Sequence, residues 1–95
     1  MTTEGLYIVS RITALTNLDV GYNPDVTPEV LRAVSGLNAL TNLDITFCRT
    51  VTDEGLRELR SLTALTSLSL YSCPNVTAAG KLALRTALPN LTIHG

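Results

Sequence analysis

The chain has 95 residues, of which 45% are hydrophobic, and its seven basic and eight acidic residues leave a net charge of -1. The charges are scattered and do not form the clustered basic face of a nucleic-acid-binding protein. There is also no run of about 18 apolar residues that would span a bilayer. We therefore expect neither a nucleic acid nor a membrane as partner.

Two cysteines are too few to form a disulfide framework. The first residues lack the basic segment followed by an apolar segment that begins a secretion signal. These two features predict an intracellular, cytoplasmic protein with reduced thiols.

A leucine-rich hexamer recurs along the chain. Copies at 15–20, 40–45 and 65–70 lie 25 residues apart, and a fourth at 88–93 follows after 23 residues. A fixed period of this length indicates a repeat architecture. The shorter last interval predicts that the final repeat has lost two positions.

A threonine precedes each helix that the pattern predicts. At the N-cap its hydroxyl accepts a hydrogen bond from an otherwise unpaired N–H of the first turn. Pro28 suits the first helical position, and acidic residues such as Glu54 complement the positive end of the helix dipole. The threonines are Thr2, Thr27, Thr52 and Thr77, and the expected helices cover residues 3–12, 28–35, 53–61 and 78–86.

The other half of each repeat reads as a β-strand. In the second copy Leu43 and Ile45 face inward while Asp44 and Thr46 face outward. A short helix is marginal alone, so its apolar stripe must pack on the strands, which right-handed crossovers make parallel. We expect one α/β domain over residues 1–95, a short horseshoe-shaped solenoid of about three and a half repeats. Its strands would lie on the concave face and its helices, starting near 3, 28, 53 and 78, on the convex face.

The motif L-x-x-L-x-L followed by Cys or Asn is similar to the leucine-rich repeat signature, over essentially the whole chain. Residues 48–59 resemble more narrowly the cysteine-containing class of these repeats, with the motif C-x-x-[IV]-T-D-x-G-L-x-x-L. The segment reads Cys48-Arg49-Thr50-Val51-Thr52-Asp53-Glu54-Gly55-Leu56-Arg57-Glu58-Leu59.

The other copies depart from this motif. Asn23 replaces the cysteine, Pro28 and Val30 replace Asp and Gly in the second copy, and Ala78 and Lys81 replace Asp and Leu in the fourth. The second cysteine of the class is absent. The resemblance implies a protein-recognition surface, as in the substrate-binding parts of ubiquitin-ligase adaptors, although nothing here resembles the F-box segment of such adaptors.

Cys48 and Cys73 occupy the same position of neighbouring repeats. They suit a disulfide or half of a metal site, but equally two buried thiols that hydrogen-bond to the backbone. Structural zinc needs four ligands, which two cysteines and His94 do not supply. We expect buried thiols, and neither a metal nor a cofactor.

Asp19 and Asp44 should lie side by side on the sheet. Paired carboxylates are the geometry of a retaining glycosidase, but the next outward residues in this column are expected to be Ser69 and Thr92, and His94 is expected at the surface. We therefore expect solvated surface or a contact with a basic partner, and no enzyme activity. The polar column Asn17, Asn42, Ser67 and Asn90 suits either a hydrogen-bonded ladder or solvent-exposed surface, and we expect the surface.

The expected function is non-catalytic binding of a protein or peptide on the concave face. Aromatic residues are enriched at interface hot spots, although the pair Tyr22 and Phe47, stacked just beyond the strands, equally suits packing against the loops. The expected contact residues are Asp19, Asp44, Thr46, Ser69 and Tyr71 on the face, with Tyr22 and Phe47 at one rim.

The first helix is unusually apolar. Tyr7 and Ile8 occupy the solvent-facing positions of Arg57 and Glu58, and apolar residues there suggest a cover. The alternative function is therefore a self-associating unit, or part of a longer array, whose apolar ends form the interface. Leu6, Tyr7 and Ile8 are the expected contact residues in a homo-oligomer.

Overall fold

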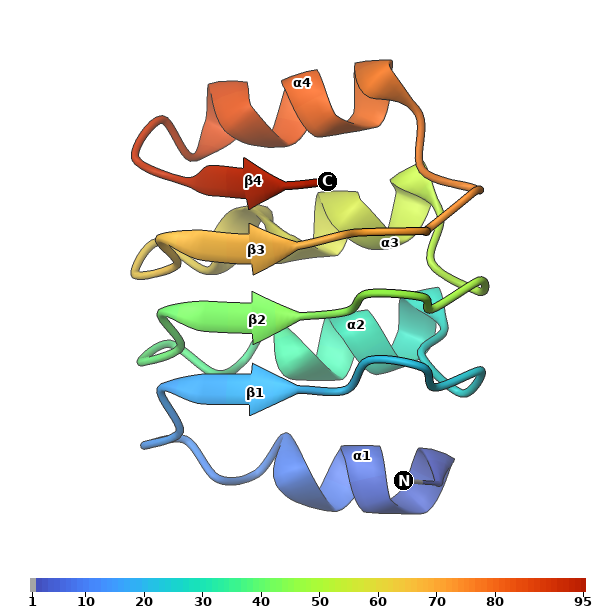
Figure 1. Ribbon diagram of the computed structural model, residues 1–95. Coiled ribbons are helices and arrows are strands. Elements are labelled where there is room, and N and C mark those ends of the chain that lie inside the picture. The colour runs from blue at the N-terminus through green and yellow to red at the C-terminus, as the bar shows by residue number, and fades with distance from the viewer. Residues whose placement is uncertain (1) are drawn as a thin grey trace.

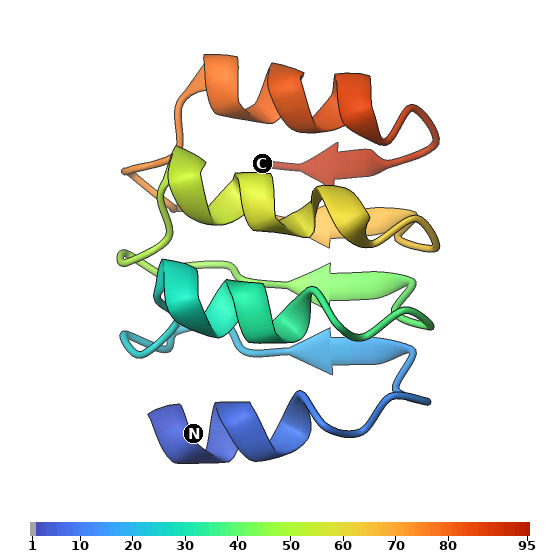
Figure 2. The same ribbon diagram turned by 180° about the vertical axis from the view of Figure 1, so that it is seen from behind.

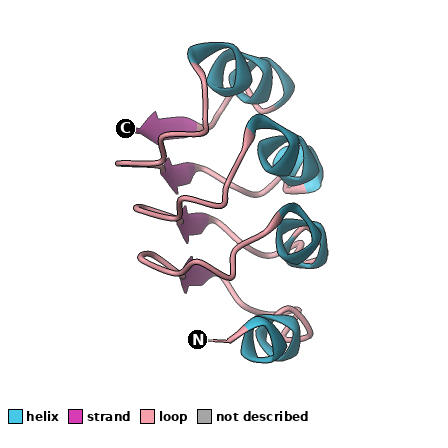
Figure 3. Ribbon diagram, turned by 90° about the vertical axis from the view of Figure 1, so that its right-hand side faces the viewer, coloured by secondary structure: helices cyan, strands magenta, loops and turns pink. Residues whose placement is uncertain are grey.

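A computed structural model describes residues 2–95 as an α/β arrangement. Four parallel strands form one sheet in the order β1-β2-β3-β4. Helices alternate with the strands along the chain and cover one face of the sheet, as the edge-on view in Figure 3 shows. This arrangement is compatible with a solenoid-like arc. The elements are α1 (Thr3–Val9), β1 (Asn17–Asp19), α2 (Pro28–Val34), β2 (Asn42–Asp44), α3 (Asp53–Glu58), the 3-10 turn η1 (Leu59–Ser61), β3 (Ser67–Ser69), α4 (Ala78–Ala87) and β4 (Thr92–His94).

Each α-helix starts where the sequence predicted. The four threonines are N-caps in extended conformation, and each hydroxyl accepts a hydrogen bond from a backbone N–H three residues on. Pro28 occupies the first turn of α2. The helix starts are fixed by local chemistry, because cap and first turn are adjacent in the sequence.

The first helix ends three residues earlier than predicted. It stops at Val9, and residues 10–13 continue in short turns, with Arg11 N–H donating to the Ile8 carbonyl and Ile12 N–H to that of Val9. α2 ends at the equivalent Val34, and Leu37 N–H donates to the Val34 carbonyl as Ile12 N–H does to that of Val9, although Leu37 is buried and Ile12 is 50% exposed. The helix end is therefore set by a turn that the repeats share. The other predicted helix ends lie within one residue of the observed ends, counting η1 as the last turn after α3.

The fourth strand corrects the predicted register. Ser67 pairs with Thr92 and Ser69 with His94, so β4 keeps the 25-residue interval of the other strands. The predicted loss of two positions is therefore wrong. The reason is that α4 extends to Ala87. Leu88 then closes the turn before the strand, where Leu91 N–H donates to the Leu88 carbonyl, as Leu65 N–H does to that of Leu62 in the preceding repeat.

The core lies between the sheet and the helices and is almost entirely aliphatic. Leu43 in β2 and Ile45, the residue after Asp44 at its end, are buried, as predicted. Among residues 2–95, Asn23 is the only polar residue that is buried. Since the helices supply the second layer, only the opposite face of the sheet is open to a ligand (Figure 3).

The open face carries polar ladders that follow the register. Asn42 Nδ2 donates to Asn17 Oδ1, and Thr41 and Thr66 donate through both N–H and hydroxyl to the carbonyl 25 residues earlier. Asn17 and Asn42 are exposed, as expected, and they are also hydrogen-bonded to each other, which the alternative of a ladder predicted for this pair. The register also puts Thr92, not Asn90, in the fourth place of this column.

The helices are spaced more widely than the strands. In Figure 1, α1 lies below β1 and α4 above β4, and the view from behind in Figure 2 shows the same order. The edge strands β1 and β4 therefore lie between the two outermost helices. In the described part of the chain, every helix is too short or too polar to cross a bilayer.

Candidate functional site

One row of side chains crosses the open face of the sheet. Asp19 is in register with Asp44, Asp44 with Ser69, and Ser69 with His94. The expected fourth member, Thr92, is wrong, because the register of β4 brings His94 into the row. A shallow hollow of about 440 Å³ lies over β1, β2 and β3.

The two carboxylates support the turns that follow their strands. Asp19 Oδ1 accepts from Gly21 N–H at 2.9 Å, and Asp44 Oδ1 accepts from Thr46 N–H at 2.9 Å. Neither carboxylate forms an ion pair with a residue of the described range 2–95. Both charges therefore remain available to a cationic group on the open face.

The order of the row argues against a nucleophilic triad. In such a triad the histidine lies between the acid and the nucleophile and hydrogen-bonds to both. Here Ser69 lies between Asp44 and His94, which are therefore separated by two strand spacings, about 10 Å. The geometry instead suits recognition of a polar or cationic segment.

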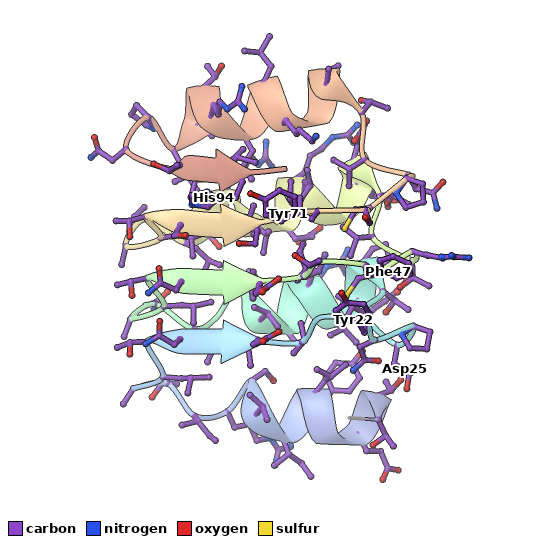
Figure 4. The ribbon with its side chains drawn as sticks, in the orientation of Figure 1. Tyr22, Asp25, Phe47, Tyr71 and His94 are labelled. Carbon is purple, nitrogen blue, oxygen red and sulfur yellow. The ribbon has the colours of Figure 1, made fainter. Side chains whose placement is uncertain are left out.

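Tyr22 and Phe47 form an aromatic rim beyond the carboxyl ends of β1 and β2, to one side of this row. Their rings stack with centroids 5.1 Å apart and planes 13° apart, as predicted (Figure 4). Tyr22 is 74% and Phe47 38% exposed. The Arg49 guanidinium lies 5.3 Å from the Phe47 ring centroid. The prediction did not include Arg49; its place two residues after Phe47 was the available signal.

The rim residues have an uncommon backbone conformation. Tyr22, Phe47 and Ser72, each 25 residues apart, have φ values of 59°, 62° and 57°. Before this turn the sheet pairing continues past the strands, with Tyr22 N–H donating to the Thr46 carbonyl and Phe47 N–H to that of Tyr71. These backbone hydrogen bonds fix the position of Tyr22 and Phe47 along the stack of repeats.

The residue after each left-handed position is buried. Cys48 Sγ donates to the Val20 carbonyl at 3.2 Å and Cys73 Sγ to that of Ile45 at 3.1 Å. Burial raises the pKa of the Cys48 thiol, against a hydrogen bond from the Asn23 backbone that lowers it. The predicted buried thiols are confirmed. Both cysteines are free, and no group of three or more metal-ligating side chains occurs within residues 2–95.

Tyr71 and Thr46 lie in the loops after their strands, not in the strands. Tyr71 is 54% exposed and Thr46 is half-buried. In Figure 4 Tyr71 lies near His94, toward the β4 side, whereas Tyr22 and Phe47 lie lower on the stack. The structure thus divides the predicted contact residues between an aromatic rim with two carboxylates and a second group near β4.

At the N-terminal end, one predicted contact residue is in the core. Leu6 is 1% exposed, so the expectation that it lies at a surface contact is wrong, because it packs inward from α1. Tyr7 and Ile8 are 40% and 63% exposed, as predicted. The prediction missed a groove of about 400 Å³ between α3 and α4, whose walls include Leu56 and Ala83.

Comparison with known proteins identifies no family for the chain. No protein-family model matches the chain, and a search of curated proteins likewise finds no match.

Proposed function

We propose that the chain is a leucine-rich repeat array of the cysteine-containing class that binds a protein or peptide segment on the open, concave face of its sheet. The 25-residue strand register and the buried column of Asn23, Cys48 and Cys73 support the assignment of the class. The role is non-catalytic, and a cytoplasmic location is part of the same proposal.

The observation that carries the proposal is the exposed aromatic rim beside two carboxylates. A left-handed backbone costs a residue with a Cβ about 1–2 kcal/mol, and strained residues concentrate at binding sites. Among residues 2–95, two of the three non-glycine residues with a left-handed backbone carry bulky rings, Tyr22 and Phe47. We infer that the rings receive an apolar or aromatic side chain of the partner.

The charges define the rest of the partner. Asp19 and Asp44 lie on the adjacent sheet face, and opposite charges facing each other steer association and fix register. The segment that fits this surface therefore has a lysine or arginine a few residues from its apolar anchor.

The test selects peptides from a random displayed library on the immobilised chain and measures their affinities. We expect enrichment of peptides that combine a basic and an aromatic residue. Removing a hot-spot ring with Tyr22→Ala should weaken binding at least about tenfold. Asp44→Asn keeps the Oδ1 that accepts from Thr46 N–H but removes the charge, so it should weaken binding of the basic peptides.

A matched control is Glu29→Gln, which removes an exposed carboxylate from α2 on the other side of the molecule and should leave affinity unchanged. Selected peptides that bind Tyr22→Ala and Asp44→Asn as tightly as the original chain would contradict the proposal. Circular dichroism of each variant separates lost binding from lost folding.

A further inference from the structure

Successive helices pack through two sets of positions. Two contacts join α2 to α3. A Cβ added to Gly55 of α3 would lie 2.8 Å from Leu31 Cδ1 of α2, and Arg32 Nε of α2 lies 3.5 Å from the Glu58 carboxylate of α3. Each helix therefore has a leading face, at the positions of Leu31 and Arg32, toward the next helix. Its trailing face, at the positions of Gly55 and Glu58, points toward the preceding helix.

At the two ends of the stack, these faces have no helix against them within residues 2–95 (Figures 1 and 2). Leu82 on α4 lies 50 residues after Arg32, in the leading position, and Ile8 on α1 lies 50 residues before Glu58, in the trailing position. They are 61% and 63% exposed, the two most exposed large aliphatic side chains of the described residues. At these two positions α2 and α3 form an ion pair. The two exposed ends of the stack instead carry one aliphatic side chain each, Leu82 on α4 and Ile8 on α1.

The end faces also differ in charge. Arg85 occupies a leading position of α4, equivalent to Arg60, which lines the groove toward α4. Lys81, one turn earlier, donates from Nζ to the Gly95 carbonyl at 3.0 Å. Glu4 occupies a trailing position of α1, equivalent to Ala79, on the opposite wall of that groove.

The whole chain has the same polarity. Residues 1–48 contain five acidic and two basic side chains, whereas residues 49–95 contain three acidic and five basic ones. The scattered charges are therefore unequally divided along the stack. Opposite ends attract and like ends repel, which favours one relative orientation of two copies.

The sheet edges match this orientation. β1 and β4 are the edge strands, and an edge strand can pair with another chain. If the register that joins β3 to β4 continued, Asn17 of a second copy would lie beside Thr92 and its Asp19 beside His94.

We propose that the chain associates head to tail with a second copy of itself. The α1 trailing face of one copy packs on the α4 leading face of the next, with Ile8 against Leu82, and β1 of the first copy pairs with β4 of the second. The two contact surfaces are different, so each added copy leaves one free surface of each kind at the ends of the assembly. The assembly therefore grows as an open array, unless the rotation between successive copies closes it into a ring. This inference is independent of the proposed peptide site.

The test is sedimentation of the 95-residue chain over a range of concentrations. The average mass should rise with concentration, and Ile8→Glu and Leu82→Arg should each weaken association at least about tenfold, because each buries an unpaired charge in the contact. Mixing the two variants should restore association. The Ile8→Glu chain keeps its Leu82 face, and the Leu82→Arg chain keeps its Ile8 face.

Three outcomes would overturn the proposal. The first is a monomer at all concentrations up to about 1 mM, which would leave these faces to another segment or partner. The second is undiminished association of the Leu82→Arg chain, which would indicate contact between two α1 helices. The third is a mixture of the variants that stays monomeric. As a control, Asn38→Glu adds the same charge as Ile8→Glu at an exposed position in the turn after α2, in the middle of the stack, and should leave the mass unchanged.

Discussion

At the scale of single residues, Asp53 links the starts of two successive helices. Its carboxylate accepts from Thr77 Oγ1 at 2.6 Å and from Thr77 N–H at 2.8 Å. The same Thr77 hydroxyl oxygen accepts from Gly80 N–H at 3.2 Å as the N-cap of α4. The side-chain and backbone hydrogen bonds from Thr77 lower the pKa of Asp53 below its ordinary value of 3.8. Pro28 holds the equivalent position of α2, so this particular link cannot form between α2 and α3.

The lowered pKa predicts how stability depends on pH. As pH falls, the unfolded state takes up the Asp53 proton before the folded state does. The contribution of Asp53 to the free energy of unfolding is therefore present above about pH 4 and is lost as pH falls through the folded pKa. Asp53→Asn should be less stable than the original chain at pH 7 and should lose less stability on acidification. Urea unfolding at a series of pH values from neutral to acid measures both effects.

The matched control is Glu54→Gln, which removes a carboxylate from the same helical turn without touching Thr77. If Asp53→Asn and the original chain lose stability in parallel below pH 4, the Thr77 hydrogen bonds do not stabilise the fold in this way.

At the scale of elements, the spacing of α2 and α3 depends on Gly55. This glycine is buried, and a Cβ on it would lie 2.8 Å from Leu31 Cδ1. At this distance the two helices, or the leucine between them, must shift. The glycine of the motif thus has a packing role here, not only a conformational one.

Gly55→Ala should lower the free energy of unfolding by about 1 kcal/mol. Overpacking a core costs about 1–3 kcal/mol, and the better helix propensity of alanine offsets roughly 0.8–1.0 kcal/mol of this. The urea midpoint measures the difference. Gly36→Ala is the control, because its nearest atom, the Ala33 carbonyl oxygen, lies at 3.4 Å. An unchanged midpoint for Gly55→Ala would mean that the two helices separate at little cost.

At the scale of the whole molecule, the end units are held less firmly than the middle ones. α1 and α4 each bury one residue, Leu6 and Leu84 respectively, whereas α2 buries three. In a stack where each unit contacts only its neighbours, stability is close to a sum of unit and interface terms. The ends therefore open first.

Hydrogen exchange should follow this order. In dilute solution the amides of α1 and α4 should exchange at least about tenfold faster than those of β2 and β3, because local opening involves fewer buried contacts. If copies associate head to tail, protection of α1 and α4 should rise together with concentration, and the Ile8→Glu chain should lack this rise. Uniform protection across the four units would show that the chain opens as one cooperative block instead.

The sequence by itself determined the features that depend on neighbouring residues or on the constant interval. Threonine caps fixed the helix starts because a cap acts within one turn, and the 25-residue period placed Tyr22 on Phe47 and each cysteine at an inward position. The end of α1 and the register of β4 were decided only by the tertiary structure. The first helix ends at Val9 because α1 and α2 close with the same turn, in which Ile12 N–H donates to the Val9 carbonyl and Leu37 N–H to that of Val34. The longer α4 sets where β4 begins. That register brings His94 into the row of Asp44, because backbone pairing and burial of the whole unit select it, not the likeness of two hexamers.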